Sequence, residues 1–595
     1  MKWGGKVKKE ITLLQEEMKK QDIDMYLLSS NDPHASEYVP DYFKARNFYS
    51  GFTGSNGDMV VTKDRAILWT DGRYFIQAER QIKSTGIELY KMGVEGYPSV
   101  EEFLTENIKK GMKLGLDSKL FSTNFIRGLK NKLEGNIVSS DLTSRFWDNR
   151  PAFPSSKAFA LPIEISGKSV SDKLSDLREY MKKEGVKTHI ITTLDEIAWL
   201  FNFRAHDIES TPVAYSYALI DMESAHLFIS ESKYNDIKSH LDKNNITVHN
   251  YEDFEDYLKE NKFETVVIDP DRLNFYLYSI ISEKAEVKED INHTLITKAV
   301  KNVVELENMK KTHLIDGIAV TKFMCWLKAN YNNKKITEIS AQEKLEDFRK
   351  KSDIFIEPSF STISAYGPNG AMMHYSADKE NETILEEGNL YLVDSGGHYM
   401  GGSTDITRTY ALGSIPREMK VDFTRVLKAV IGLSTATFLE GCAGTSLDVL
   451  SRIELWKHHI DYRSGTGHGI GYMLGVHEPP NGFRWRLVKE RFDSAILKPG
   501  MITTVEPGVY KENEYGIRLE NMLVTVKDEK NEYGQFLKFE NIALSPIDLD
   551  AILPEMLNEK EKEYLNNYHS EVYAKLSPYM DDKELEILKN YTREI

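Results

Sequence analysis

The sequence predicts an α/β fold with three globular domains and a short helical extension at the C-terminus. Two patterns support this prediction. A helix followed by an apolar strand occurs twice in the first half of the chain, and the second half alternates longer apolar segments with glycine-rich turns. With 595 residues, the chain is also several times longer than one typical domain, so we expect more than one buried core.

The repeated pattern is an amphipathic helix that leads into a strand. Its first copy ends in the strand 25–28, and its helical stripe is Val7, Ile11, Leu14 and Met18. Its second copy leads into a strand that begins at 189–191, and its stripe is Val170, Leu174, Leu177 and Met181. Apolar residues at this spacing cover one face of a helix. The two copies predict two related α/β units.

Composition changes place the domain boundaries. Prolines and serines over 150–156 are typical of a linker, because proline breaks regular structure. A charged helical stretch over 298–311 precedes the segments that carry histidine, acids and glycine, and residues 553–595 are charged and free of glycine. The predicted parts are the domains 1–155, 156–300 and 301–545 and the extension 546–595.

Charge and cysteine content exclude several classes of protein. A net charge of -16 argues against nucleic-acid binding, because such proteins concentrate lysine and arginine on one face. Cys325 and Cys442 are too few for a disulfide framework or a cysteine zinc site, and we expect both to be reduced and buried. The N-terminal basic residues precede no apolar segment, and no later run is long enough to span a membrane. These features predict a cytoplasmic protein.

Two aspartates follow apolar strand patterns in the third domain. Asp394 ends the run 390–394, and Asp405 begins the strand-like run 405–409. Glycines at 396, 397, 401 and 402 favour a hairpin that brings the two carboxylates together. Close carboxylates repel each other, and a divalent cation removes that repulsion. Taken singly, either aspartate is also compatible with an ordinary solvated turn.

A histidine and two glutamates complete the set of candidate ligands. His468 lies in the glycine-rich stretch 465–471, which on its own is also typical of a structural histidine. Glu506 and Glu520 lie in apolar strand-like segments. Two alternatives remain open for Glu520: a plain ion pair with Arg518, or metal ligation with Arg518 as a support.

Four carboxylates and one imidazole supply enough donors for two divalent ions. These hard ligands suit manganese, and cobalt, zinc or iron are also compatible with them. Two ions roughly 3.5 to 4 Å apart can share a water, lower its pKa and stabilise the intermediate of amide hydrolysis. The pattern therefore predicts a peptidase site with no serine or cysteine nucleophile.

In their order along the chain, these residues resemble the ligands of the creatinase/aminopeptidase P/methionine aminopeptidase superfamily, which has the pita-bread fold. The resemblance implies the metal ligands Asp394, Asp405, His468, Glu506 and Glu520. It also implies that Asp405 and Glu520 bridge the two ions, that Asp394 holds one ion, and that His468 and Glu506 hold the other.

Within this superfamily the chain is most similar to the long, three-domain Xaa-Pro aminopeptidases. The similarity covers almost the whole chain and includes the segments 50–55, 70–74, 194–200, 367–371, 374–375, 476–478 and 565–569. It implies two creatinase-like N-terminal domains before the pita-bread domain, a homodimer, and substrates that are peptides with proline at the second position.

The same similarity implies residues that contact the substrate. His374 is expected to stabilise the oxyanion or carry a proton to the departing proline nitrogen, and His477 to hold the peptide carbonyl. Both are also compatible with ordinary structural histidines. Arg73 resembles an N-terminal-domain arginine that reaches the substrate, in its own subunit or a neighbouring one, and an arginine after Asp71 could equally be a turn residue held by its neighbour.

One position departs from the pattern of many relatives. They carry a histidine four residues before the metal-binding histidine, where this chain has Ser464. Because serine supplies neither the bulk nor the charge of an imidazole, we expect a different substrate-side wall and a shift in specificity.

The predicted reaction is hydrolysis of the first peptide bond by a hydroxide that bridges two divalent ions. Glu506 acts in it as ligand and proton acceptor. Two alternatives remain: a prolidase that cleaves Xaa-Pro dipeptides, and a binding protein that has kept the fold and lost catalysis. The length and the doubled N-terminal unit favour the aminopeptidase, and the five persisting ligand positions argue against an inactive relative.

Overall fold

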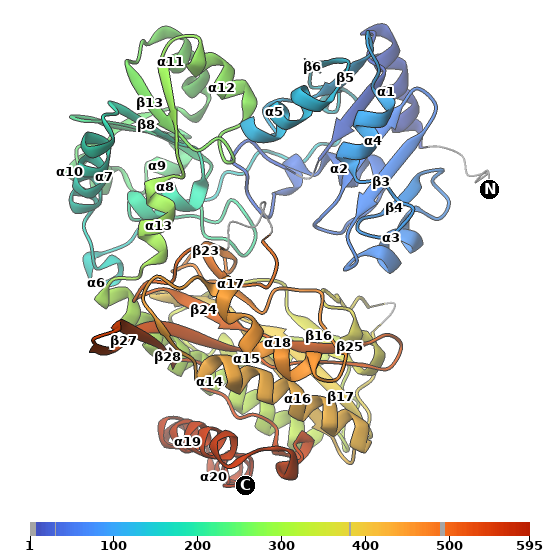
Figure 1. The fold of residues 1–595 in the computed structure, drawn as a ribbon, viewed down its shortest axis with the longest axis vertical. Coiled ribbons are helices and arrows are strands. Elements are labelled where there is room, and N and C mark those ends of the chain that lie inside the picture. The colour runs from blue at the N-terminus through green and yellow to red at the C-terminus, as the bar shows by residue number, and fades with distance from the viewer. Residues whose placement is uncertain (1–7, 30, 380–381, 488–493) are drawn as a thin grey trace. The chain divides into compact units, whose positions relative to one another are not determined.

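The computed structural model describes residues 8–29, 31–379, 382–487 and 494–595. The chain forms two compact units, drawn in Figure 1. The first contains residues 1–160, 170–209 and 213–294. The second contains residues 161–169, 210–212 and 295–595. The domain limits predicted at 155, 300 and 545 stay predictions, because a division into two units does not test them.

The first unit begins with a six-stranded sheet in the order β4-β3-β2-β1-β5-β6. Its strands are β1 (Met25–Leu28), β2 (Asp58–Thr62), β3 (Ala66–Thr70), β4 (Glu88–Lys91), β5 (Lys113–Leu116) and β6 (Asn136–Ser139). Helix α1 (Lys9–Lys20) buries Ile11, Leu14 and Met18 against this sheet, which confirms the predicted stripe. Val7 lies outside the described residues. Helices α4 (Val100–Asn107) and α5 (Thr123–Lys132) contribute to a second apolar cluster with the same strands.

The same unit contains a second sheet, in the order β12-β11-β10-β8-β13-β14. Its strands are β8 (Thr188–Ile191), β10 (Ser216–Asp221), β11 (Ala225–Ile229), β12 (Thr247–His249), β13 (Thr265–Ile268) and β14 (Glu286–Glu289). In both sheets the central strand is antiparallel to one neighbour and parallel to the other. Helix α7 (Val170–Glu184) buries the second predicted stripe. The prediction of two related α/β units is confirmed.

The second unit is built on antiparallel sheets. One sheet has the order β21-β28-β27-β24-β22-β23, and two smaller ones have the orders β16-β17-β20 and β15-β18-β19. The strands are β15 (Phe355–Pro358), β16 (Ile363–Tyr366), β17 (Asn389–Ser395), β18 (Gly397–Tyr399), β19 (Gly402–Ser403), β20 (Ile406–Leu412), β21 (Thr437–Leu439), β22 (Gly467–Gly469), β23 (Glu478–Phe483), β24 (Ile502–Val505), β27 (Asn521–Asn531) and β28 (Gly534–Asn541). A separate hairpin joins β25 (Gly508–Lys511) and β26 (Tyr515–Arg518).

Long helices cover these sheets and supply the core. Helices α14 (Val303–Asn330) and α15 (Glu338–Arg349) pack their apolar residues against β17 and β20. Helix α16 (Arg417–Ser434) packs against the larger sheet, and α18 (Val449–Trp456) lies beside α16. A capping box, in which Asn302 and Glu305 exchange hydrogen bonds, fixes the start of α14. The ligand-bearing strands are therefore held on a rigid scaffold.

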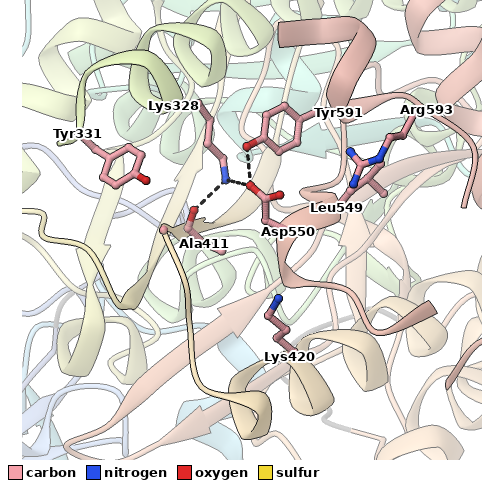
Figure 2. A pocket seen from close by; sticks show the side chains of 9 residues that line it. Lys328, Tyr331, Ala411, Lys420, Leu549, Asp550, Tyr591 and Arg593 are labelled. Carbon is pink, nitrogen blue, oxygen red and sulfur yellow. Dashed lines mark hydrogen bonds and ion pairs between the residues drawn. The ribbon is translucent and has the colours of Figure 1, made fainter. Parts of the chain in front are cut away.

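The C-terminal extension is helical, as predicted. It contains α19 (Glu559–Leu576) and α20 (Asp582–Tyr591), and the hydroxyl of Tyr568 in α19 accepts a hydrogen bond of 2.9 Å from Arg408 of β20. A cavity of about 460 Å³ lies between α14, β20 and α20. Figure 2 shows Lys328 in this cavity, where its ammonium donates to Asp550 and to the carbonyl oxygen of Ala411.

Two further predictions concern cysteines and membrane spans. Cys325 is buried in α14, and burial raises the pKa of its thiol. The prediction that Cys442 is buried was wrong. This residue follows the turn after β21 and is only partly buried. In the described ranges of the chain, we find no helix that combines the length and the apolar character needed to cross a bilayer.

Candidate metal centre

The pairing of β17 with β20 brings the two aspartates to one edge of their sheet. Asp394 lies opposite Thr407, and Ser395 lies opposite Ile406, so Asp405 directly precedes the paired segment. The short hairpin of β18 and β19 connects the two strands, which confirms the predicted hairpin. Gly396 is required at the turn, since a Cβ there would lie 1.9 Å from the carbonyl oxygen of Thr404.

His468, Glu506 and Glu520 reach the same place from the larger sheet. His468 lies in β22, Glu506 follows β24, and Glu520 lies between β26 and β27. His468 Nε2 lies 3.3 Å from Glu506 Oε1 and 3.6 Å from Asp405 Oδ2. One ligand atom each from Asp405, His468 and Glu520 lies within 4.8 Å of the others. Asp394 belongs to the same group, because its charge acts on both Asp405 and Glu520.

The electrostatics of this cluster favour bound cations. Burial, and next the charge of Asp394, raise the pKa of Asp405 to about 8. Burial, and next Asp405, raise the pKa of Glu520 well above its usual value. In the part of the chain that the structure describes, Asp394 Oδ1 and Glu520 Oε1 are buried and have no hydrogen-bond partner. Buried carboxylates without partners are costly, so this donor set fits divalent metal ions.

His468 is oriented for ligation. Its Nδ1 lies 2.9 Å from the carbonyl oxygen of Gly469, and a proton on Nδ1 that donates to this oxygen leaves the lone pair on Nε2 facing the carboxylates. Burial lowers the pKa of His468, whereas Glu506 and Asp405 raise it to about 9 overall. Burial raises the pKa of Glu506, but the hydrogen bond from His468 leaves it below its usual value.

Arg518 pairs with Asp394, whereas the sequence had offered Glu520 as its partner in a plain ion pair. Metal ligation by Glu520 stays a prediction. Its Nη2 donates to Asp394 Oδ2 over 2.6 Å, and its Nη1 donates to the Tyr510 hydroxyl over 2.8 Å. The Arg518 Nε also donates to Thr407 Oγ1 over 3.1 Å, and this hydroxyl donates to Glu520 Oε2 over 2.9 Å. One guanidinium thus orients Asp394 directly and Glu520 through a threonine.

Neither Thr407 nor Tyr510 was predicted from the sequence. Thr407 follows Asp405 by two residues, so the period of a strand, which places alternate residues on one face, could have indicated it. Tyr510 reaches Arg518 because β25 pairs with β26, with Gly508 opposite Arg518 and Tyr510 opposite Gly516. No spacing in the sequence predicts this pairing partner.

The predicted substrate histidines lie in the same unit. The ring of His477 is 4.4 Å from the ring of His468, at an interplanar angle of 89°. His374 is half-buried and follows the 3-10 helix Gly367–Ala371. Its neighbour Tyr375 packs against an apolar cluster of Ile363, Ala365 and Leu392 in β16 and β17, and β17 carries Asp394. His477 therefore contacts the ligand cluster, and the segment of His374 packs on the sheet that bears it.

Arg73 and Ser464 have other surroundings. In the first unit, Arg73 Nη2 donates to Asp71 Oδ2 over 2.6 Å, as expected for a turn residue held by its neighbour, and its role toward the substrate stays a prediction. In the second unit, Ser464 is partly buried, and its carbonyl oxygen accepts a hydrogen bond of 2.7 Å from Arg452. The effect of Ser464 on specificity also stays a prediction.

Sequence comparisons cover nearly the whole chain. Models of the creatinase/prolidase N-terminal domain match residues 11–150 and 149–305, the model of metallopeptidase family M24 matches 307–527, and that of the C-terminal region of peptidase M24 matches 535–595. The "Probable Xaa-Pro aminopeptidase P" of Coprinopsis cinerea is 36% identical over 99% of this chain and 98% of its own length. The chain belongs to metallopeptidase family M24, among the Xaa-Pro aminopeptidases. As a family member, it is a metal-dependent aminopeptidase.

Other relatives agree with this membership. "Xaa-Pro aminopeptidase 1" of Dictyostelium discoideum is 36% identical over 98% of this chain and 96% of its own length. The crystal structure of the X-prolyl aminopeptidase from Caenorhabditis elegans, described as a cytosolic enzyme with a di-nuclear active site, is 32% identical. It covers 98% of this chain and 99% of its own chain, with a TM-score of 0.92. The Xaa-Pro dipeptidase from Bacillus anthracis covers 64% of this chain and 99% of its own, with 25% identity and a TM-score of 0.52.

Proposed function

We propose that this family M24 aminopeptidase hydrolyses the peptide bond between an N-terminal residue and a following proline. The observation that carries the proposal is the convergence of His468 and buried carboxylates in one cluster, two of whose oxygens have no hydrogen-bond partner among the described residues. A site built in this way suits bound cations, and Xaa-Pro aminopeptidases match almost the whole chain.

Two divalent ions, manganese in the first place, are the proposed cofactors. Asp394 would hold one ion, His468 and Glu506 the other, and Asp405 and Glu520 would be shared. The ligand set consists mainly of carboxylates, which suits manganese, and the imidazole also accepts cobalt, zinc or iron. When bound, the pair of ions supplies Lewis-acid activation of a water and of the scissile carbonyl.

The side chains of the protein would bind the peptide and move protons. Glu506 is proposed to accept the proton of the attacking water, since its Oε1 lies 3.3 Å from His468 Nε2, inside the cluster that would hold the metal ions. His477, in ring contact with His468, is proposed to hold the peptide carbonyl. His374 would stabilise the oxyanion or donate a proton to the departing proline nitrogen.

We further propose a cytoplasmic homodimer. A cytosolic location is printed for the Caenorhabditis elegans relative, which covers this chain almost completely. Exposed apolar side chains on α18, namely Val449, Leu450 and Ile453, support a protein interface, since such residues at one place favour association. Arg73 is the candidate residue through which the first unit reaches a substrate, in its own subunit or the neighbouring one.

The proposal is tested by peptide hydrolysis after removal of metal. The protein is treated with a chelator, and manganese, cobalt and zinc are added back separately. Hydrolysis of Xaa-Pro-Xaa peptides is expected to return with metal, and most strongly with manganese. Activity confined to Xaa-Pro dipeptides would instead indicate a prolidase. An inactive binding protein would show no turnover and no stoichiometric metal.

A further inference from the structure

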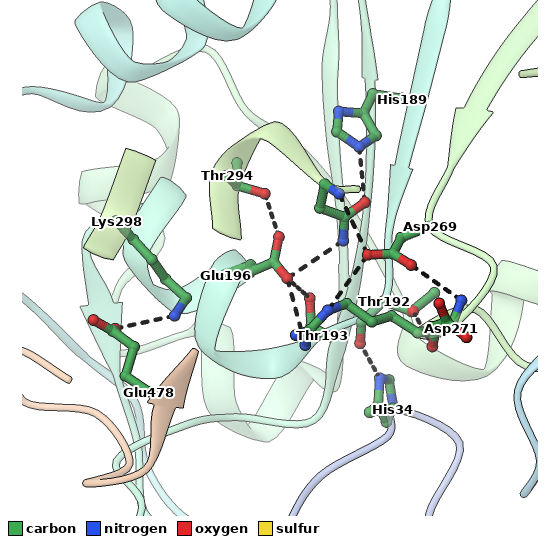
Figure 3. Close-up of polar contacts among 12 residues, drawn as sticks. His34, His189, Thr192, Thr193, Glu196, Asp269, Asp271, Thr294, Lys298 and Glu478 are labelled. Atoms are coloured by element: carbon green, nitrogen blue, oxygen red, sulfur yellow. Dashed lines mark hydrogen bonds and ion pairs between the residues drawn. The ribbon is translucent and has the colours of Figure 1, made fainter. Parts of the chain in front are cut away.

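Glu478, the residue that follows the predicted substrate histidine His477, belongs to a buried ion cluster. The carboxylate of Glu478 accepts a hydrogen bond of 3.0 Å from Lys298 Nζ through Oε2, and a second from Lys301 Nζ through Oε1. The three residues are 3%, 1% and 4% exposed, respectively. Figure 3 shows the contact between Lys298 and Glu478. Because each oxygen accepts a hydrogen bond from a different lysine, the carboxylate is held in one orientation. We call these three residues the lysine clamp.

The clamp fixes the end of the turn that presents His477. The amide of Glu478 donates to the carbonyl oxygen of Val476 over 3.0 Å, which makes His477 the central residue of a three-residue turn. Glu478 also lies opposite Gly469 in the pairing of β22 with β23. It is therefore adjacent in sequence to His477, and paired with the residue that follows the ligand His468. A shift of Glu478 would move the two rings relative to each other.

The lysines are themselves tied to the strand of another ligand. Lys298 lies in the last turn of α13 (His293–Ala299), and Lys301 precedes α14. The amide of Lys301 donates to the carbonyl oxygen of Gly500 over 3.0 Å, and Val300 forms a bridge with Met501. Met501 leads into β24, and Glu506 directly follows the end of this strand. The clamp thus connects the start of the Glu506 strand with the His477 turn.

Stability alone does not account for such a cluster. Removing charges from water costs several kcal/mol for each ion, and well-packed apolar residues often stabilise a protein as well as or better than a buried ion pair. What ionic contacts provide in addition is a defined geometry, because they are made only at a particular distance and angle. That geometry is useful where a displacement of about 1 Å lowers the rate on the order of a hundredfold.

We propose that the lysine clamp of Lys298, Lys301 and Glu478 positions His477 against His468 for catalysis. It acts through His477, so its members are positioning residues and not catalytic ones. The effect on turnover rests on the proposed function, in which His477 holds the peptide carbonyl. The effect on the placement of the His477 ring does not depend on that function.

Glu478→Gln is the variant that tests the clamp, because it keeps the shape of the side chain and removes the charge that both lysines require. The matched control is Asp316→Asn, which breaks a similarly buried ion pair between Asp316 and Arg349, 2.7 Å apart with 3% and 2% of the side chains exposed. We expect Glu478→Gln to bind as much manganese as the wild type and to lose kcat by roughly tenfold to a hundredfold. Asp316→Asn is expected to retain kcat per folded molecule. Equal losses in both variants would overturn the proposal.

A double-mutant cycle separates positioning from plain structural support. In a His477→Ala background, Glu478→Gln is expected to cause no further loss of kcat, since coupled residues are not additive. An additive loss would overturn the proposal. Lys301→Met should behave like Glu478→Gln, and it serves as the second variant if Glu478→Gln does not fold.

The crystal structure of Glu478→Gln provides a readout that needs no activity. The His477 ring is expected to leave its 4.4 Å contact with the His468 ring. An unmoved ring would overturn the clamp. If the wild type cleaves no Xaa-Pro peptide, the proposed function fails, whereas the clamp is still decided by the position of this ring.

Discussion

Arg518 and Asp394 form an ion pair of 2.6 Å that joins the β25–β26 hairpin to the three-stranded sheet of the metal centre. Asp394 comes from β17 in the three-stranded sheet, and Arg518 ends β26 of the β25–β26 hairpin. Both side chains are nearly buried, with 12% and 5% exposed, so the pair is poorly screened by water. The pair holds one oxygen of Asp394, and the other, Oδ1, is buried and has no hydrogen-bond partner among the described residues.

Replacing Arg518 by lysine is expected to weaken metal binding. The guanidinium donates at once to Asp394, Tyr510 and Thr407, and an ammonium cannot reproduce this planar arrangement. Loss of such a support typically costs about tenfold to a hundredfold in metal affinity. Titration with manganese against a competing chelator measures the change. Tyr510→Phe, which removes only one acceptor, should have a smaller effect, and an unchanged affinity in Arg518→Lys would refute the role of this residue.

Asp405→Asn should separate stability from activity. In the metal-free protein, burial and next the charge of Asp394 raise the pKa of Asp405 to about 8, so folding at neutral pH has to protonate this carboxyl, whereas an amide is neutral in both states. We expect the metal-free variant to unfold at a higher temperature than the metal-free wild type, by roughly 2–4 °C for each kcal/mol gained. Peptide hydrolysis should be abolished. Addition of manganese should raise the midpoint of the wild type much more than that of the variant. A lower midpoint in the metal-free variant would contradict this account.

Much of the scaffold could be predicted from the sequence because local patterns determine it. The apolar stripes of α1 and α7, each followed by a strand, predicted the two N-terminal α/β units. The glycines between Asp394 and Asp405 predicted the hairpin. These features depend on residues a few positions apart. The five candidate ligands were also indicated by local patterns, because Asp394 ends an apolar run, Asp405 begins one, and His468 lies among glycines. Their role as ligands stays a prediction.

Contacts across the fold could not be predicted in this way. Strand alternation places Arg518 and Glu520 on one face, so the sequence offered Glu520 as an ion-pair partner of Arg518 and indicated no distant acid. The structure decides for Asp394, 124 positions away. Lys298 and Glu478 are 180 positions apart, and no period links them. Such pairs depend on sheet register, which hydrophobic patterns fix only for the strands themselves.

The C-terminal extension should make stability depend on pH through His569. This side chain is fully buried in α19, and its Nε2 accepts a hydrogen bond of 3.1 Å from the amide of Ile547. Burial, and next the charge of Arg408, lower its pKa from 6.5 to about 3. Below pH 6.5, His569 therefore binds a proton in the unfolded chain but stays neutral in the folded chain. The stabilisation is complete above pH 6.5 and is lost as the pH falls toward 3, by about 1.4 kcal/mol per pH unit.

The test compares urea unfolding midpoints at pH 7.5 and 5.5. His569→Gln, whose amide oxygen can accept from Ile547, should lose less stability between these values than the wild type, by about 1.4 kcal/mol. His458→Gln changes an exposed histidine and is the control. Its stability should change between the two pH values as much as that of the wild type. An identical loss of stability between pH 7.5 and 5.5 in all three proteins would show that His569 does not cause this pH dependence.

Gly467 should be essential for the placement of His468, because the backbone of β24 lies against it. A Cβ at this position would lie 1.9 Å from the carbonyl oxygen of Thr504, and the strand cannot move away without displacing β22. Overpacking of this kind typically costs about 1–3 kcal/mol. We expect Gly467→Ala to lose most of its metal binding and hydrolysis.

The control is Gly128→Ala in α5, where nothing lies within 4 Å of the added atom. Alanine is the better helix former by about 1 kcal/mol, so this variant should be more stable and fully active. Normal metal content in Gly467→Ala would show that β22 tolerates the displacement and that His468 does not need this close packing.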